Sequence, residues 1–131
     1  MAVGDEDTVA RMSHLFDQPA VPEHTARFLE DERHHLLVAR EGGELVGFVT
    51  GVEVTHPDKG TEMFLYELAV GEPWPRQGIG RSLVEALVDL ARERGCYGMW
   101  VLTDEDNEAA VATYTSAGGA RRTQVMLDWE W

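Results

Sequence analysis

Basic and glycine residues gather in residues 76–82, directly after an apolar run over residues 63–70. The apolar run is typical of a buried strand, and Gly71, Pro73 and Pro75 predict a turn behind it. Apolar residues then recur three or four positions apart, which indicates an amphipathic helix. A strand, a glycine-rich turn and a helix start leave unpaired N–H groups pointing outward, where phosphate groups bind well. The stretch therefore predicts a site for a phosphate-bearing ligand.

Two common phosphate-binding patterns do not fit this stretch. The Gly-x-x-x-x-Gly-Lys-Ser/Thr sequence is missing, which disfavours a P-loop NTPase. The Gly-x-Gly-x-x-Gly pattern of a dinucleotide fold is incomplete, because Leu83 stands where the third glycine is needed. Gly78 and Gly80 alone are a weak signal, while Arg76 and Arg81 add positive charge to the helix dipole.

A longer comparison of motifs is more specific. Arg-Gln-Gly-Ile-Gly-Arg-Ser-Leu at residues 76–83, preceded by Leu68-Ala69-Val70, resembles the acyl-CoA pyrophosphate loop of the GNAT superfamily of N-acetyltransferases. Residues 106–114 are similar to the late helix of that superfamily, with an Asn near the start and a Tyr further on. The resemblance covers residues 35 to 128. Residues 66–70 and 110–115, together with Asp104, are also similar to the aminoglycoside 3-N-acetyltransferase branch.

The resemblance implies direct transfer of an acetyl group from acetyl-CoA to an amine. Such a reaction needs a neutral amine, donors for the developing oxyanion and a proton for the thiolate that leaves. By analogy, Glu67 is the base, the Leu68 N–H polarises the thioester carbonyl, and Tyr114 is the general acid. The resemblance assigns the cofactor to Leu68, Ala69, Val70, Arg76, Gln77, Gly78, Ile79, Gly80, Arg81, Ser82, Asn107, Ala110 and Tyr114. No metal is expected.

Each of these roles has a plainer alternative. Tyr114 lies at helical spacing from Ala110 and Val111, so it could be a buried structural tyrosine. Asn107 is a good helix N-cap whether or not it touches a cofactor. The superfamily pattern also has Gln or Arg where this chain has Pro75, and proline donates no N–H. Arg76 would have to compensate for that loss.

Acidic residues predict the acceptor. A carboxylate in an apolar strand is costly to bury unpaired, so Glu67 is expected beside a cationic substrate, unless it faces solvent or an arginine. By resemblance, Asp104 contacts the substrate ammonium, and Asp128 widens the acidic rim unless it is simply solvated. The net charge of −13 favours a cationic small-molecule amine and disfavours nucleic acid and acidic membranes.

The remaining composition limits location and partners. A single cysteine, Cys96, and the absence of a long apolar run indicate a cytoplasmic protein. The five histidines lack metal-ligand spacing. The aromatic residues 129–131 could pack on a partner subunit or line the acceptor cleft, so a homodimer stays open.

One domain over residues 1–131 is expected, of the α/β (α+β) class. The resemblance predicts the GNAT fold: a mixed, mostly antiparallel sheet with helices on both faces, its first strand short or missing. Asp7 or Thr8 is expected to cap a first helix that carries Val9 and Met12. Further helices are expected over residues 23–31, 79–94 and 107–117, and strands over residues 35–40, 45–55, 63–70, 96–103 and 120–129.

The sequence thus favours an N-acetyltransferase acting on a cationic acceptor, with the 3-amino group of an aminoglycoside as the specific expectation. A polyamine, small-amine or peptide N-acetyltransferase is the alternative within the class. A non-catalytic acyl-CoA-binding module is the alternative from another class.

Overall fold

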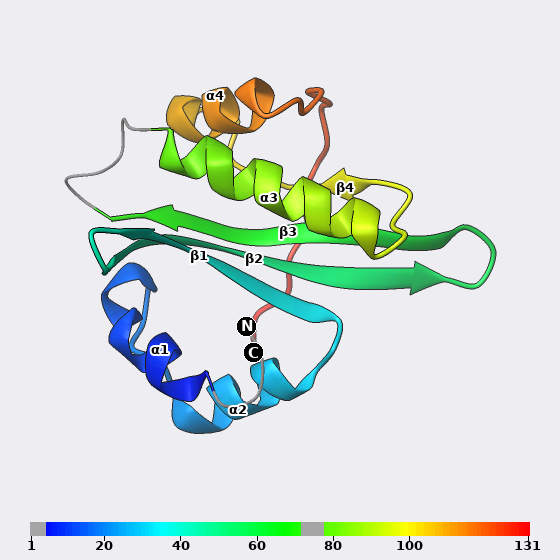
Figure 1. Cartoon of the computed structure of the whole chain (residues 1–131). Coiled ribbons are helices and arrows are strands. Elements are labelled where there is room, and N and C mark those ends of the chain that lie inside the picture. The colour runs from blue at the N-terminus through cyan, green and yellow to red at the C-terminus, as the bar shows by residue number, and fades with distance from the viewer. Residues whose placement is uncertain (1–4, 72–77) are drawn as a thin grey trace.

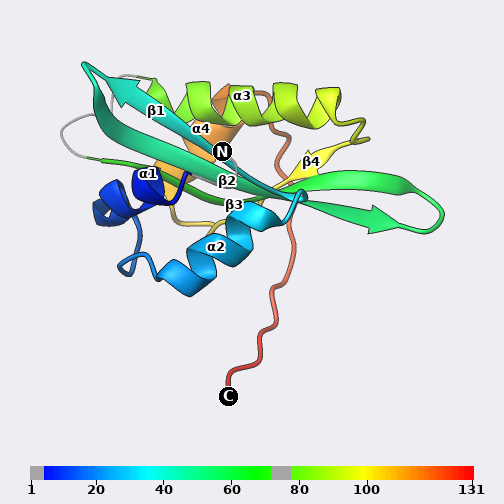
Figure 2. The ribbon, with the colours of Figure 1, turned by 60° about the horizontal axis from the view of Figure 1, so that its bottom comes forward.

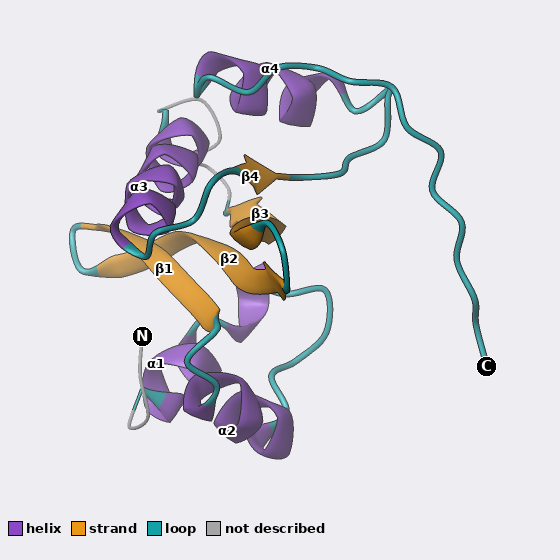
Figure 3. Cartoon of the chain, turned by 90° about the vertical axis from the view of Figure 1, so that its right-hand side faces the viewer, coloured by secondary structure: helices purple, strands orange, loops and turns teal. Residues whose placement is uncertain are grey.

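A four-stranded sheet separates two layers of helices (Figure 1). The computed structural model describes residues 5–71 and 78–131. Helices α3 and α4 cover one face of the sheet, and α1 and α2 cover the other (Figure 3). The helices are α1 (Glu6–Arg11), the short 3-10 turn η1 (Ser13–Leu15), α2 (Pro22–Glu30), α3 (Ile79–Glu93) and α4 (Glu108–Ser116). The strands are β1 (His34–Glu41), β2 (Glu44–His56), β3 (Gly60–Val70) and β4 (Met99–Trp100).

The strands follow one another in space as they do in the sequence, in the order β1-β2-β3-β4. The pairs β1–β2 and β2–β3 are antiparallel hairpins, as the turn residues between them predict. The pair β3–β4 is parallel because α3 carries the chain back across the sheet between them. The predicted mixed sheet is therefore confirmed, and the described chain begins with a helix rather than a strand.

Each face of the sheet holds its own apolar core. On the α3 side the buried residues are Val49, Met63, Leu65, Leu83, Val84, Leu87 and Ala91. On the α1–α2 side they are Val9, Met12, Leu29, Leu36 and Phe48. Gly51 permits the closest packing on the α3 side, because a Cβ there would lie 2.9 Å from Met63 Sδ and 3.1 Å from Leu87.

A β-bulge divides β3 into two halves. Thr50 pairs with Glu67 and the next residue, Gly51, pairs with Leu65, so Tyr66 is an extra residue on β3. Before the bulge Leu65 points to the α3 side, and after it Leu68 does so again. The bulge therefore turns Glu67 toward the α1–α2 face of the sheet, where simple alternation from Leu65 would have pointed it at α3.

The ends of α2, α3 and α4 lie within one residue of expectation, and the start of α1 differs by more. Asp5, rather than Asp7 or Thr8, is the N-cap of α1, and its side chain makes no capping bond. Asn107 caps α4 as predicted, with its side chain accepting from the Ala110 N–H at 3.2 Å. Gly95 and Gly118 follow α3 and α4 with positive φ angles. None of the helices that the structure describes is long and apolar enough to cross a membrane.

The last part of the chain is where the predicted fold is wrong. The strand expected over residues 96–103 is reduced to Met99–Trp100, and residues 120–129 form no strand. Segment 120–131 is exposed throughout and runs away from the rest of the chain (Figure 2). Its apolar alternation is that of a strand, but a strand needs a neighbour to pair with, and the described chain offers it none there.

An ion-paired cluster ties β1, β2 and α3 together. Glu53, which is 8% exposed, accepts hydrogen bonds from His35 Nε2 at 2.6 Å and from Arg94 Nε at 2.8 Å. Burial alone would raise the pKa of Glu53, but the hydrogen bonds from His35 and Arg94 outweigh it and hold that pKa below its usual value.

We predict that Glu53→Gln lowers the free energy of unfolding by about 1–3 kcal/mol at pH 7, because two hydrogen bonds to a charge are weakened. A carboxyl group whose pKa is lower in the folded protein than in the unfolded one stabilises the folded state at pH values above the unfolded pKa. That contribution is lost as the pH falls through the folded pKa. The difference in unfolding free energy between the wild type and Glu53→Gln should therefore become smaller as the pH falls below 4.5, the ordinary pKa of a glutamate. Urea unfolding at several pH values measures it, with Arg33→Gln at an exposed ion pair as the control. A constant difference across pH would contradict this account.

Candidate active site

The start of α3 presents backbone donors to solvent. Gly78 adopts a left-handed conformation with φ +73°, which lets the chain turn sharply into Ile79. Ser82 N–H donates to the Gly78 carbonyl at 3.0 Å and closes the first turn. The N–H groups of the residues between them lack such partners within the helix, as at every helix start. The beginning of α3 is therefore suited to an anion.

The charged residues expected here contribute unequally. Arg81 lies on the surface, where its Nε is 3.4 Å from Glu85 Oε1, so part of its charge is already compensated. Arg76 and Gln77 lie outside the described residues, and so does Pro75, the departure from the superfamily pattern. Ile79 packs against the α3-side core and orients the helix start, while Ser82 is exposed.

Gly80 brings three elements together beside this helix start. A Cβ at Gly80 would lie 3.2 Å from Thr113 Cγ2 on α4 and 3.7 Å from Val70 Cγ2 at the end of β3. Any larger residue would push α4 or β3 aside. The start of α3, the end of β3 and the middle of α4 therefore lie side by side, although α4 is far from the other two in the sequence.

The end of β3 has one unpaired side. Pairing with β4 stops at Phe64 and Trp100, so among the described strands the part of β3 that follows has a neighbour only in β2. Gly71 N–H donates to the Val46 carbonyl at 2.7 Å and Glu67 N–H to Thr50 Oγ1 at 3.1 Å, and both acceptors are on β2. Because backbone direction alternates along a strand, the N–H groups of Leu68 and Val70 face the other way, toward the edge of β3 that no described strand covers. We call this unpaired edge, from Leu68 to Val70, the opening.

Ala69 lies between these two donors and turns its side chain to the α1–α2 core. Leu68 packs instead against the α3-side core. Both side chains hold the strand in place, so the direction of the Leu68 and Val70 N–H groups is fixed by packing on both faces of the sheet.

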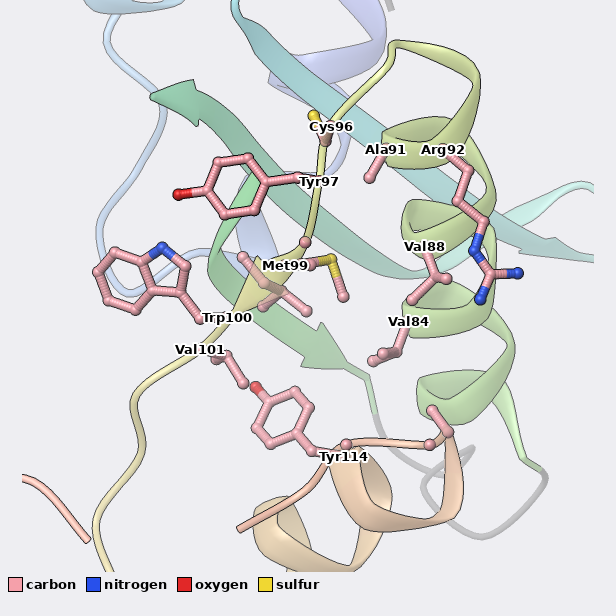
Figure 4. A pocket seen from close by; sticks show the side chains of 15 residues that line it. Val84, Val88, Ala91, Arg92, Cys96, Tyr97, Met99, Trp100, Val101 and Tyr114 are labelled. Atoms are coloured by element: carbon pink, nitrogen blue, oxygen red, sulfur yellow. The ribbon is translucent and has the colours of Figure 1, made fainter. Parts of the chain in front are cut away.

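Tyr114 lies on the α3 side of this opening. Its ring packs against the α3-side core, as the helical spacing predicts, and its hydroxyl points toward Val101 (Figure 4). Burial raises the pKa of Tyr114 above its ordinary value, and no described residue hydrogen-bonds its hydroxyl. Tyr114 therefore stays protonated at neutral pH and has a proton to donate.

Two other α4 residues, Asn107 and Ala110, were expected at the cofactor. The Asn107 side-chain oxygen is already bonded to the Ala110 N–H, which leaves its amide NH₂ as the group available to a ligand. Ala110 is half-buried on the face of α4 that also carries Tyr114. Asn107 thus has a structural role as the N-cap of α4, and a contact with a ligand would be a second role.

Glu67 lies on the α1–α2 side of the opening and is half-buried. Burial raises the pKa of Glu67, and the nearby carboxylate of Asp17 raises it further. Among the described residues no arginine or lysine pairs with Glu67, and its side chain is only partly withdrawn from solvent. A carboxylate of this kind accepts a proton more readily than an exposed one.

Asp17 is the one residue at this site that the sequence did not single out. It lies in the segment between η1 and α2, fifty positions before Glu67, and it is exposed. An acidic residue in a polar loop carries no motif, so only the packing of α1 and α2 on the sheet reveals its position. Together Asp17 and Glu67 give the α1–α2 side of the opening a negative charge.

The two remaining predicted substrate residues are placed differently. Asp104 is exposed in the segment before α4, where its carbonyl accepts from the Asn107 N–H at 3.1 Å. Asp128 is exposed on segment 120–131, which runs away from the rest of the chain (Figure 2). The carboxylate that acts on Glu67 is that of Asp17.

An apolar cavity of about 360 Å³ lies beside the site rather than in it (Figure 4). Tyr114 is the one predicted site residue that lines it. The wall also contains Val84 and Val88 of α3, Met99 of β4 and Val101. Glu67, Leu68 and Gly80 do not line it. The cavity is a gap at the edge of the α3-side core.

Comparison with known proteins identifies the family. Residues 5–118 match the model of the "Acetyltransferase (GNAT) family", so the chain belongs to this family. It is 35% identical over 105 residues to the N-alpha-acetyltransferase RimI of Mycobacterium tuberculosis, covering 80% of this chain and 64% of that protein. It is 40% identical over 57 residues to the [Ribosomal protein bS18]-alanine N-acetyltransferase of Escherichia coli K12, covering 44% of this chain and 38% of that protein. The chain thus spans less than two thirds of either relative.

Solved structures confirm the GNAT fold. An aminoglycoside acetyltransferase, meta-AAC0020 from an uncultured soil metagenomic sample in complex with sisomicin, superposes with a TM-score of 0.89 at 23% identity. That match covers 100% of this chain and 92% of the other. AAC(6')-Iy in complex with the bisubstrate analog CoA-S-monomethyl-acetylneamine has a TM-score of 0.81 at 18% identity, over 100% and 95% of the two chains.

We predict that Asp17→Asn lowers the pKa of Glu67, because a neighbouring like charge disfavours ionisation and its removal favours it. Carbon-detected NMR of the side-chain carboxyl groups measures the titration directly. Asp89→Asn on the outer surface of α3 is the matched control and should leave Glu67 unchanged. An equal titration of Glu67 in all three proteins would show that Asp17 does not act on it.

Proposed function

We propose that this protein transfers an acetyl group from acetyl-CoA to the amine of a cationic acceptor. One observation carries the proposal: the unpaired end of β3 directs the Leu68 and Val70 N–H groups into an opening, with Glu67 on one face of the sheet and Tyr114 on the other. An acceptor amine and a thioester approaching from these two faces would meet at the strand. Family membership supports the same chemistry.

The described residues fit the co-substrate. The N–H groups at the start of α3 suit its pyrophosphate, and Gly80 keeps that helix start free of side-chain bulk beside α4 and β3. The Val70 N–H would hold the pantetheine amide. Arg76, Gln77, Gly78 and Arg81 are proposed to complete the phosphate site, with Asn107 and Ala110 lining the α4 side.

Glu67 and Tyr114 would divide the proton transfers between them. Glu67, directly or through a water molecule, takes a proton from the acceptor ammonium, and the raised pKa of Glu67 suits it to this task. The neutral amine nitrogen then forms a bond to the acetyl carbon while the Leu68 N–H stabilises the negative charge growing on the carbonyl oxygen. As the carbon–sulfur bond breaks, Tyr114 gives its proton to the departing sulfur. The acetylated nitrogen loses its extra proton, which restores the Tyr114 hydroxyl through water, and Glu67 returns its proton to solvent. The products are the acetylated amine and coenzyme A.

The acceptor is proposed to carry several positive charges. Glu67 and Asp17 on the α1–α2 side, with Asp104 before α4, provide negative charge around the opening, and the whole chain carries −13. The 3-amino group of an aminoglycoside is the specific proposal, supported by the fold of the sisomicin complex. Polyamines and other small amines carry the same kind of charge.

A peptide N-terminus is the second candidate acceptor. The similarity to RimI of Mycobacterium tuberculosis, at 35% identity over 80% of this chain, favours it. A non-catalytic acyl-CoA-binding role is the third, because Pro75 stands where the superfamily pattern has Gln or Arg. A cytoplasmic location and a homodimer, both suggested by the sequence, belong to this proposal too.

We predict that Tyr114→Phe lowers kcat roughly 10²- to 10⁴-fold and leaves acetyl-CoA affinity nearly unchanged, because it removes a proton donor and keeps the ring packing. Free-thiol release measures turnover, and calorimetry measures binding. Tyr97→Phe, which removes a hydroxyl near Glu62 instead, is the matched control.

Glu67→Gln should lower kcat by a similar factor and abolish the acidic limb of the pH profile of kcat, because the group that accepts the proton is lost. Glu62→Gln on the same strand should do neither.

The same assay, run with aminoglycosides, spermidine and a peptide with a free N-terminus, separates the acceptors. Turnover with the aminoglycosides alone supports the specific proposal, and turnover only with the peptide replaces it with the RimI-type reaction. Binding of acetyl-CoA without turnover on any acceptor, in the wild type as in Tyr114→Phe, would favour the non-catalytic role.

A further inference from the structure

Three aromatic side chains form a continuous surface on β3 and β4. The ring of Trp100 stacks on that of Phe64, with 4.2 Å between the ring centroids and 23° between the ring planes. The ring of Tyr66 meets Phe64 edge-on at 5.6 Å. Tyr66 is 67% exposed and Trp100 is 41% exposed, so this group, which we call the aromatic platform, is open to solvent. Large aromatic residues that are exposed together mark an interaction surface.

The register of the strands places the aromatic platform on the α1–α2 side of the sheet. Gly51 faces the core beneath α3, so the next residue, Val52, faces the opposite side. Val52 pairs with Phe64, and Phe64 pairs with Trp100. Side chains of directly paired residues lie on the same face of a sheet, so both rings share the face of Val52. The ring of Trp100 accordingly points away from α3 (Figure 4).

The bulge in β3 places the aromatic platform directly beside Glu67. Successive residues of a regular strand point to opposite faces, but the bulge interrupts this alternation. Leu65 and Leu68 both face α3, and the two residues between them face the other side. Tyr66 does so in contact with Phe64, and Glu67 does so in register with β2. A ring and a carboxylate are therefore neighbours on one face, next to the opening.

The charge around the aromatic platform favours a cation. Asp17 lies close enough to Glu67 to raise the pKa of that carboxyl group, and the whole chain carries a net charge of −13. The face of an aromatic ring also attracts a cation. The surface therefore suits a molecule with a flat apolar body and ammonium groups at its rim. A saturated six-membered ring that carries amino groups has this form, because its C–H groups make an apolar face.

A linear polyamine fits the same surface less well. It carries the same charges but has no flat face to lie on the rings. It also loses the freedom of several rotatable bonds when it is held along a surface, whereas a ring is already rigid. The aromatic platform therefore favours ring compounds among cations of similar charge.

We propose that the aromatic platform binds a saturated ring of the acceptor and selects cationic ring compounds, such as amino sugars, over linear polyamines. The inference rests on the proposed function, in which Glu67 takes the proton from the acceptor amine. The acceptor ring lies with its C–H face on Tyr66 and Trp100, and the amine to be acetylated reaches Glu67. Phe64 is a positioning residue, because its ring supports the other two.

Proton NMR of the acceptor tests the stacking without any turnover. An aromatic ring shifts protons that lie over its face upfield, so we expect upfield changes for the ring protons of sisomicin bound to the full chain with coenzyme A. Tyr66→Ala and Trp100→Leu should each diminish these changes, and Tyr66→Phe should keep them because the ring remains. Tyr97→Ala, at an aromatic residue 55% exposed outside the aromatic platform, is the matched control and should keep them too.

Two results of this experiment would overturn the proposal. One is sisomicin that does not bind, or that binds the wild type without upfield changes. The other is a set of upfield changes that are equal in the wild type, Tyr66→Ala and Trp100→Leu, because another surface would then hold the acceptor ring.

Steady-state kinetics test the selection of ring compounds. We expect a higher kcat/KM for sisomicin than for spermidine in the wild type. Tyr66→Ala should narrow this difference about tenfold, through the KM for sisomicin, because stacking acts equally before and during the transfer. A wild type that prefers spermidine, or an equal effect of Tyr66→Ala on both acceptors, would overturn the selection. Upfield changes in sisomicin without turnover of any acceptor would refute the proposed function and leave the aromatic platform standing as a surface that binds cationic rings.

Discussion

The separation of β3 from β4 is the constraint on which the site depends. Two parallel strands that stayed paired to their ends would use the Leu68 and Val70 N–H groups in the ladder, and no donor would face a ligand. In this chain pairing stops after Phe64 and Trp100. The start of α3 and the middle of α4 then close around the gap through Gly80, whose missing side chain lets Thr113 and Val70 approach. An opening lined by backbone donors follows from where one strand pair ends.

The bulge at Tyr66 gives that opening two chemically different sides. It turns Glu67 to the α1–α2 face, where burial and Asp17 raise the pKa of the carboxyl group. The α3 face keeps a buried tyrosine whose pKa is also raised. A proton acceptor and a proton donor are thus separated by the sheet itself, with the backbone donors between them. Removal of one residue from β3 would point Glu67 into the α3-side core.

Local patterns in the sequence predicted most of this arrangement. The hairpins, the parallel pair, the helix start after Gly78 and the Asn107 cap all depend on residues close together in the chain, and all are confirmed. Asp17 was missed because its effect on Glu67 arises from tertiary packing. The strand predicted over residues 120–129 was wrong for a related reason. Alternation shows that a segment can be a strand, but a strand also needs a neighbour to pair with, and the described chain places none beside this segment. The functional roles of Glu67, Tyr114 and Asp104 stay predictions.

The central claim is that the opening at the end of β3 binds the acyl-CoA. Titration of the ¹⁵N-labelled protein with coenzyme A tests it most directly, because every amide of the site reports separately. We expect the largest shift changes at Leu68, Val70 and Gly80, with smaller ones at Asn107 and Ala110. Changes confined to the residues that line the apolar cavity, such as Val88 and Met99, with Leu68 and Val70 unaffected, would contradict the account.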